Sequence, residues 1–202
     1  MRTFGMVAVL ICVSLGTGFG VSWVQICEAQ TSGTKAATQR AAQVSSPDIK
    51  QQLRSYFFDA ARSGNTSMLA EFIAAKYDLN TRDEKGYTAL ILAAYHGNDE
   101  AVDVLMNAGA DPCAADLHGN TALMGAIYKG ELGIARRLLG AKCNPDQKNA
   151  AGQTAAMYAA LFGRIEILQS LQDQGADLKA KDSAGNTAEQ LSRGIFAQSE
   201  RN

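Results

Sequence analysis

Histidine and acidic side chains are the groups in this sequence that could bind a metal ion or catalyse a reaction. The two histidines, His96 and His118, have no Cys, Asp or Glu at a metal-ligand spacing. Asp83, Asp116 and Asp182 could supply carboxylates for acid-base chemistry, but they recur at one position of a repeated unit, which favours a structural role. Nucleophile-elbow, zinc-protease and phosphate-loop motifs are absent from the sequence. We therefore predict no enzyme activity, no metal site and no cofactor.

The cysteines fall into two groups. Cys12 and Cys27 lie in an apolar N-terminal segment, whereas Cys113 and Cys143 lie in the body of the chain. An oxidising compartment would permit a disulfide bond between the second pair. Stacked repeat units lie about 10 Å apart, however, whereas bridged Cα atoms lie about 5.5 Å apart. We therefore expect no bridge, and we interpret Cys143 as a small buried residue equivalent to Ala110 of the preceding unit.

Glycine recurs in this chain with a constant period of 33 residues. One set, in which each glycine is followed two positions later by Thr-Ala, is Gly86, Gly119, Gly152 and Gly185. A second set with the same spacing is Gly64, Gly97, Gly130 and Gly163. A period of this length is typical of a stack of identical supersecondary units.

Residue types within one unit predict two helices. In the second unit, Thr88 can cap a first helix and Gly97 can end it in the left-handed conformation. Residues 98–100, Asn-Asp-Glu, suit the start of a second helix, and Gly109 suits its end. Upstream, the Ser-Pro-Asp sequence at 46–48 predicts the start of the first helix of the array, which we expect to cover about Asp48 to Arg62.

The N-terminus indicates export. Arg2 precedes an apolar run from Met6 to Leu15, and Cys27-Glu28-Ala29 offers small residues for cleavage. The alternative is an uncleaved anchor, because Phe4 to Ile26 carries no charge and is long enough to cross a bilayer. Either interpretation places the rest of the chain outside the cytoplasm.

The remaining chain of this 202-residue sequence divides by composition and period. Residues 30–46 are rich in Thr, Ser, Ala and Gln and predict a flexible linker. The expected divisions are a signal or anchor at 1–29, the linker at 30–46, a repeat domain at 47–194 with repeats at about 53–86, 87–119, 120–152 and 153–185 and a cap at 186–197, and a tail at 198–202. A net charge of -1 without long single-sign runs excludes the usual signature of a nucleic-acid or membrane-surface binder.

The repeated motifs resemble those of the ankyrin family. They are Gly-x-Thr-Ala-Leu at Gly86–Leu90 and Gly119–Leu123, Ala-Ala-x-x-Gly at Ala93–Gly97 and Ala159–Gly163, and Gly-Ala-Asp at Gly109–Asp111 and Gly175–Asp177. The resemblance covers about Asp48 to Gly194 and implies an all-α ankyrin-repeat solenoid of helix-turn-helix units with short β-hairpin loops. It also implies that the recurring aspartates bond the hairpin backbone. In the third repeat Lys142 replaces the helix-ending glycine, so we expect a distorted helix end.

Binding in an ankyrin array is expected on the concave face, which is built from the hairpin tips and the exposed side of each first helix. Tyr95, Tyr128 and Leu161 lie 33 residues apart and should form one stripe. Exposed aromatic side chains flanked by charges are typical of binding hot spots. The predicted partner-binding residues are Glu84, Lys85, Tyr87, Tyr95, His96, Leu117, His118, Tyr128, Lys129, Leu161 and Phe162.

Two functions of different classes are compatible with such a face. With its export signal, the chain resembles small periplasmic ankyrin proteins of Gram-negative bacteria. The resemblance implies a location in the periplasm, or in the inner membrane facing the periplasm if the anchor is retained. It also implies a scaffold for an envelope protein, with a link to catalase and peroxide protection. The alternative is an inhibitor or immunity protein whose concave face blocks a toxic periplasmic hydrolase. Both interpretations predict a monomer that binds another protein.

Overall fold

A computed structural model describes residues 46–196 of the chain, with side chains described from Ile49 onward. The signal or anchor predicted at 1–29, nearly all of the predicted linker and the predicted tail lie outside the described residues. The helices are α2 (Ser46–Ser63), α3 (Thr66–Ala74), α4 (Ala89–Tyr95), α5 (Asp99–Asn107), α6 (Ala122–Lys129), α7 (Leu132–Leu139), α8 (Ala155–Leu161), α9 (Ile165–Asp173) and α10 (Ala188–Ser192).

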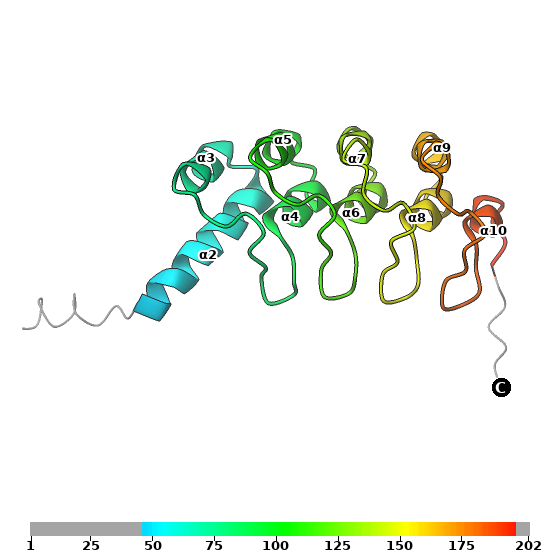
Figure 1. Cartoon of the computed structure of the whole chain (residues 1–202), viewed down its shortest axis with the longest axis horizontal. Coiled ribbons are helices and arrows are strands. Elements are labelled where there is room, and N and C mark those ends of the chain that lie inside the picture. The colour runs from blue at the N-terminus through cyan, green and yellow to red at the C-terminus, as the bar shows by residue number, and fades with distance from the viewer. Residues whose placement is uncertain (1–45, 197–202) are drawn as a thin grey trace, which may run out of the picture. The chain divides into compact units, whose positions relative to one another are not determined.

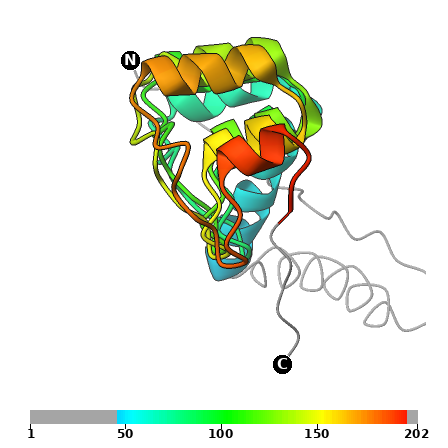
Figure 2. The same ribbon diagram turned by 90° about the vertical axis from the view of Figure 1, so that its right-hand side faces the viewer.

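These helices stack in two layers (Figure 1). The inner layer contains α2, α4, α6, α8 and α10, and the outer layer contains α3, α5, α7 and α9. The loop from each outer helix to the next inner helix descends on one side as a hairpin, as the end-on view in Figure 2 shows. Within residues 46–196, β pairing is confined to an isolated bridge between Ala115 and Thr121. The predicted all-α solenoid of helix pairs and short hairpins is confirmed.

Threonine starts each inner helix of the regular repeats. The hydroxyl of Thr88 accepts a hydrogen bond from the backbone N–H of Ile91 at 3.3 Å, and Thr121 and Thr154 make the equivalent bond at the same distance. Thr187 forms a full capping box with Gln190 at the start of α10. Because these caps satisfy N–H groups that have no partner inside the helix, the recurring Thr-Ala marks where each inner helix begins.

The tips of successive hairpins are bonded to one another. The backbone N–H of Leu117 donates to the carbonyl of Lys85 at 3.1 Å, Ala150 donates to His118 at 2.7 Å, and Ser183 donates to Ala151 at 3.0 Å. At Gly86, where φ is 79°, a Cβ atom would lie 2.6 Å from the backbone nitrogen of Leu117. The tips approach so closely that a side chain would separate them, so glycine recurs there. The hairpins therefore form a continuous, mutually bonded row.

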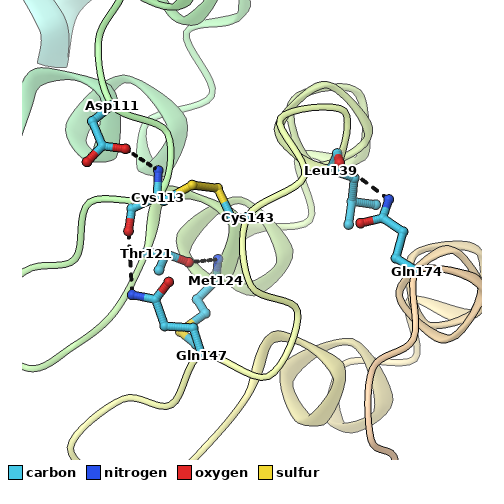
Figure 3. The surroundings of a disulfide bond; sticks show 8 residues. All are labelled: Asp111, Cys113, Thr121, Met124, Leu139, Cys143, Gln147 and Gln174. Carbon is cyan, nitrogen blue, oxygen red and sulfur yellow. Dashed lines mark hydrogen bonds between the residues drawn. A yellow bond between two sulfur atoms is a disulfide. The ribbon is translucent and has the colours of Figure 1, made fainter.

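The prediction that Cys113 and Cys143 are not bridged is wrong. They form a disulfide bond, with their Cα atoms 5.5 Å apart, between the second and third repeats (Figure 3). The expected 10 Å spacing describes the helices, whereas these cysteines lie on loops through which adjacent repeats touch. Cys143 is half-buried rather than fully buried, unlike Ala110 at the same position of the preceding repeat.

The end of the third outer helix differs only slightly from its equivalents. Helix α7 has 8 residues, against 9 in α5 and in α9, and Gly140 caps it in the right-handed conformation. Lys142 then adopts a φ of 54°, the left-handed region that Gly109 and Gly175 occupy at the same position of their repeats. The lysine takes over the role of the glycine, so the expected distortion is limited to a shortening of the helix by one residue.

Candidate functional site

The candidate site is the concave face, defined here as the exposed side of α4, α6 and α8 together with the facing hairpins. Its main feature is a row of aromatic rings that crosses three repeats. The rings of Tyr95 and Tyr128 are stacked at 6.2 Å between centroids and an interplanar angle of 10°. The ring of Phe162 meets Tyr128 edge-on at 5.2 Å. The row therefore presents a large aromatic surface in which each ring packs against its neighbour.

The aromatic row remains open to solvent. Tyr95 is 40% exposed and Tyr128 is 48% exposed, although both lie on helices whose other residues are mostly buried. Leu161 is 42% exposed at the end of α8, and Leu117, on a hairpin tip, is 70% exposed. A buried hydrophobic core therefore holds a partly exposed aromatic surface, which is the arrangement that binding hot spots use.

Predicted partner-binding residues occupy this face in three different environments. The charged or imidazole side chains that are exposed are Glu84, Lys85, His96, His118 and Lys129. The exposed apolar or aromatic ones are Tyr95, Leu117, Tyr128 and Leu161. Tyr87 and Phe162 are partly buried, and Tyr87 packs against the core. Burial, with smaller contributions from Asp116 and Asp83, raises the pKa of Tyr87.

The third member of the row differs from the one that the 33-residue period predicts. Leu161 lies at the predicted position, but the ring that contacts Tyr128 belongs to Phe162, the C-cap of α8. The ammonium of Lys129 lies 5.1 Å from the centroid of the Tyr95 ring, a distance typical of a cation–π contact. Consecutive repeats therefore contact each other along the row through aromatic ring contacts and a cation–π contact.

Sequence reasoning missed a polar network that adjoins the row at Phe162. The amide of Asn149 donates to the side-chain oxygen of Asn120 at 2.9 Å and to the hydroxyl of Tyr158 at 3.3 Å. Burial raises the pKa of Tyr158, and the hydrogen bond from Asn149 opposes this change. Tyr158 also contacts Phe162, with ring centroids 6.1 Å apart. The signal was present in the sequence as a tyrosine one helical turn before Phe162, but α4 and α6 have no tyrosine at that position.

The recurring aspartates act on the hairpin backbone. The carboxylate of Asp83 accepts hydrogen bonds from the N–H groups of Lys85 and Tyr87 at 2.9 and 2.8 Å. Asp116 and Asp182 accept the equivalent bonds in their own hairpins. The structural interpretation of these three residues is confirmed.

Among residues 46–196, no group of three or more His, Cys, Asp or Glu side chains could hold a metal ion. In the same range, no helix is long and apolar enough to cross a membrane.

A groove adjoins the row at the N-terminal end of the array. It has a volume of about 920 Å³ and lies between α2, the first hairpin and α4. Helix α2 has 18 residues, whereas α4 and α8 have 7 each, and the longer helix forms the wall of the groove that faces the first hairpin. Tyr95 belongs to both the groove and the row, so the two features form one continuous surface.

Comparisons with known proteins agree with this architecture. Residues 57–149 match the family model for ankyrin repeats in three copies, and residues 151–183 match the model for a single ankyrin repeat. Over 56 residues, 28% of this chain, it is 45% identical to human ankyrin repeat and SAM domain-containing protein 4B, covering 13% of that protein. Over 54 residues, 27% of this chain, it is 43% identical to the bovine mitochondrial disaggregase, covering 8% of that protein.

The chain spans less than a fifth of the length of these relatives, so the similarity concerns the repeats themselves. Ankyrin repeats form scaffolds for binding other proteins and share no common chemistry. With ankyrin models matching residues 57–149 and 151–183, a range that includes the aromatic row, this chain belongs to the ankyrin-repeat proteins.

Proposed function

We propose that this chain is an exported, non-catalytic scaffold that holds an envelope protein on its concave face. The observation that carries the proposal is the aromatic row of Tyr95, Tyr128 and Phe162, which crosses three repeats and stays partly exposed. Rigid aromatic side chains bring a large contact area at a small cost in conformational entropy. The bonded hairpin tips keep these residues in one arrangement, which lowers the ordering cost of binding.

The disulfide bond supports the exported location. Disulfides persist in oxidising compartments and are rare in the cytosol of most organisms. Cys113 and Cys143 are joined across a repeat junction, and the sequence begins with an apolar run of the kind that directs export. Both features favour a periplasmic location, with the chain either free after cleavage or held by its N-terminal segment.

The kind of partner follows from the resemblance to exported bacterial ankyrin proteins. We favour an envelope enzyme of oxidative-stress defence, such as a catalase, which the scaffold would hold or protect. The array itself would be monomeric when no partner is bound.

The test is affinity capture with the full chain, tagged at its C-terminus and expressed in its native cells. Two variants are compared with the unchanged protein: Tyr128→Asp, which places a charge in the centre of the row, and Tyr56→Asp, which changes a tyrosine that is 55% exposed on α2 and lies outside the groove and the row. We expect one envelope protein to be captured by the unchanged chain and by Tyr56→Asp, and lost with Tyr128→Asp.

Equal capture by all three proteins would overturn the concave-face proposal. The identity of the captured protein decides the class of function: a catalase or redox enzyme supports the scaffold, whereas a hydrolase that loses activity in the complex would identify an inhibitor. Fractionation of the same cells tests the location, and recovery of the chain with the cytosol would contradict export.

A further inference from the structure

Charge is distributed unequally between the two faces of the array. The inner helices α4, α6 and α8 contain no Asp or Glu, whereas α5 and α9 of the outer layer carry several. The outer acids are partly neutralised, since Arg137 pairs with Asp99 at 2.9 Å and with Asp103 at 2.7 Å. Among the cations of the inner face, Arg62 is the one that forms ion pairs within the described residues.

The groove at the N-terminal end concentrates these cations. Lys50 and Arg54 project from α2, and Lys85 stands on the opposite wall at the first hairpin tip. Lys50 and Lys85 form no ion pair within the described residues. The guanidinium of Arg54 donates to the backbone carbonyl of Arg82 and lies 5.9 Å from the ring centroid of Phe58, so hydrogen bonding holds it in place without neutralising its charge.

The acidic residues of the groove do not offset these charges. Asp83 bonds its own hairpin backbone and is paired with Arg62 at 3.5 Å. Arg62 is in turn paired with Asp59 at 2.8 Å. Glu84 is the remaining acid in the lining, against the three cations Lys50, Arg54 and Lys85.

Apolar residues lie between the two charged walls. Phe58, Ile91 and Leu92 line the groove and are almost fully buried, and Tyr95 continues the lining into the aromatic row. The volume of about 920 Å³ is in the range of sites that bind compact ligands. The groove therefore combines an apolar floor with cationic walls.

We infer that this groove binds an acidic segment of the partner, with carboxylates facing Lys50, Arg54 and Lys85 and an apolar or aromatic side chain on the floor. The inference rests on the proposed function, because the groove and the row share Tyr95 and would hold the same partner. Complementary charge speeds association and selects among partners, so the row would supply most of the contact area and the groove would choose acidic sequences.

The experiment uses fluorescence anisotropy with the full chain and short fluorescein-labelled peptides as probes. One peptide alternates Glu with Leu and contains a single Phe, a second has Gln in place of each Glu, and a third has Lys there. We expect the Glu peptide to bind at least about tenfold more tightly than the Gln peptide, and its affinity to fall as salt is added. The Lys peptide should not bind.

Variants locate the binding. The double substitution Lys50→Glu with Lys85→Glu should lower the affinity for the Glu peptide by about tenfold or more. The matched double substitution Lys142→Glu with Lys179→Glu, at exposed lysines outside the groove, should leave that affinity unchanged. Lys50→Gln with Lys85→Gln should give an intermediate loss, which separates charge from any failure of the reversed variant to fold.

Three results would overturn the inference: equal affinity for the Glu and Gln peptides, equal loss with both double reversals, or equally tight binding of a single-stranded oligonucleotide of the same charge. None of them affects the capture experiment, in which loss of the partner depends on Tyr128→Asp. Capture that Lys50→Glu with Lys85→Glu leaves unchanged, together with loss on Tyr128→Asp, would reject the acidic segment and retain the scaffold.

Discussion

Cys113 is bonded to Cys143 at the junction between the second and third repeats, and neighbouring junctions are closed by a different bond at the same place. One repeat earlier, the side-chain oxygen of Asn80 accepts a hydrogen bond from the N–H of Asp111 at 2.8 Å. One repeat later, Asp146 accepts the equivalent bond from Asp177, also at 2.8 Å. Cys113 takes the position of Asn80 and Asp146 in the 33-residue period, and it is joined to Cys143, the residue before the equivalent of Asp111 and Asp177. This junction therefore has a covalent bond next to the position where the others have a hydrogen bond.

Removal of this disulfide should lower the stability of the array. The bond closes a loop of 30 residues in sequence separation, for which the chain-entropy model gives a stabilisation of about 3 to 4 kcal/mol. We expect Cys113→Ser with Cys143→Ser to reduce the free energy of unfolding by that amount, measured by urea denaturation. A reducing agent should destabilise the unchanged protein to a similar extent and leave the variant unaffected.

A second double variant tests the equivalence of the two kinds of junction. Cys113→Asn with Cys143→Ala offers the side-chain oxygen that Asn80 supplies one repeat earlier. It should be more stable than the serine variant by about 1 kcal/mol, the usual net contribution of a hydrogen bond. Equal stability of the two variants would mean that Asn at this position does not form that bond.

Lys142→Gly should stabilise the protein. The φ of 54° at Lys142 is in the left-handed region, which glycine adopts without the steric cost of a Cβ atom. The gain, less the greater freedom of glycine in the unfolded chain, should be up to about 1 kcal/mol in the free energy of unfolding. Lys179→Gly is the control, because Lys179 is exposed and does not have a positive φ, so this change should destabilise.

Tyr128→Ala should separate binding from stability. The ring is 48% exposed, so its loss should cost less than about 1 kcal/mol while abolishing partner capture. The adjacent residue Ile127 is fully buried, and Ile127→Ala should cost about 2 to 5 kcal/mol. Thermal denaturation of both variants measures the difference, and a loss at Tyr128 as large as that at Ile127 would assign the ring to the core.

Tyr158→Phe should change the dependence of stability on pH. The pKa of Tyr158 is raised in the folded state, chiefly by burial, so the unfolded chain releases this proton first as pH rises. Its contribution is present below the ordinary tyrosine pKa of about 10 and is lost as pH rises from there through the folded value. Above about pH 10 the unchanged protein should therefore lose stability more steeply than Tyr158→Phe. Parallel curves from denaturation at several pH values would contradict this.

Local chemistry explains how much of the fold could be predicted from the sequence. The capping threonines act within their own repeat, and glycine is the residue that adopts a positive φ most easily, so the residue types alone indicate where helices begin and end. Identical repeats stack in the same orientation, which is why the period also predicted that Tyr95 and Tyr128 lie side by side.

The tertiary structure decided the features that depend on distances between repeats. Phe162, beyond the end of α8, contacts Tyr128 because of the way the fourth repeat packs on the third, and the 33-residue period carries no record of that packing. The groove exists because α2 is longer than the other inner helices and stands opposite the first hairpin.

The disulfide bond is the clearest example of the difference between what the sequence determines and what the tertiary structure decides. The sequence determined that Cys113 and Cys143 lie in adjacent repeats, but their Cα separation of 5.5 Å depends on how closely the loops of those repeats approach. That approach is set by the packing of the helices and by hydrogen bonds between the loops, such as the bond that the side-chain amide of Gln147 donates to the carbonyl of Cys113 at 3.4 Å. The period of a repeat fixes which positions are equivalent, whereas only the stacked structure fixes how far apart they are.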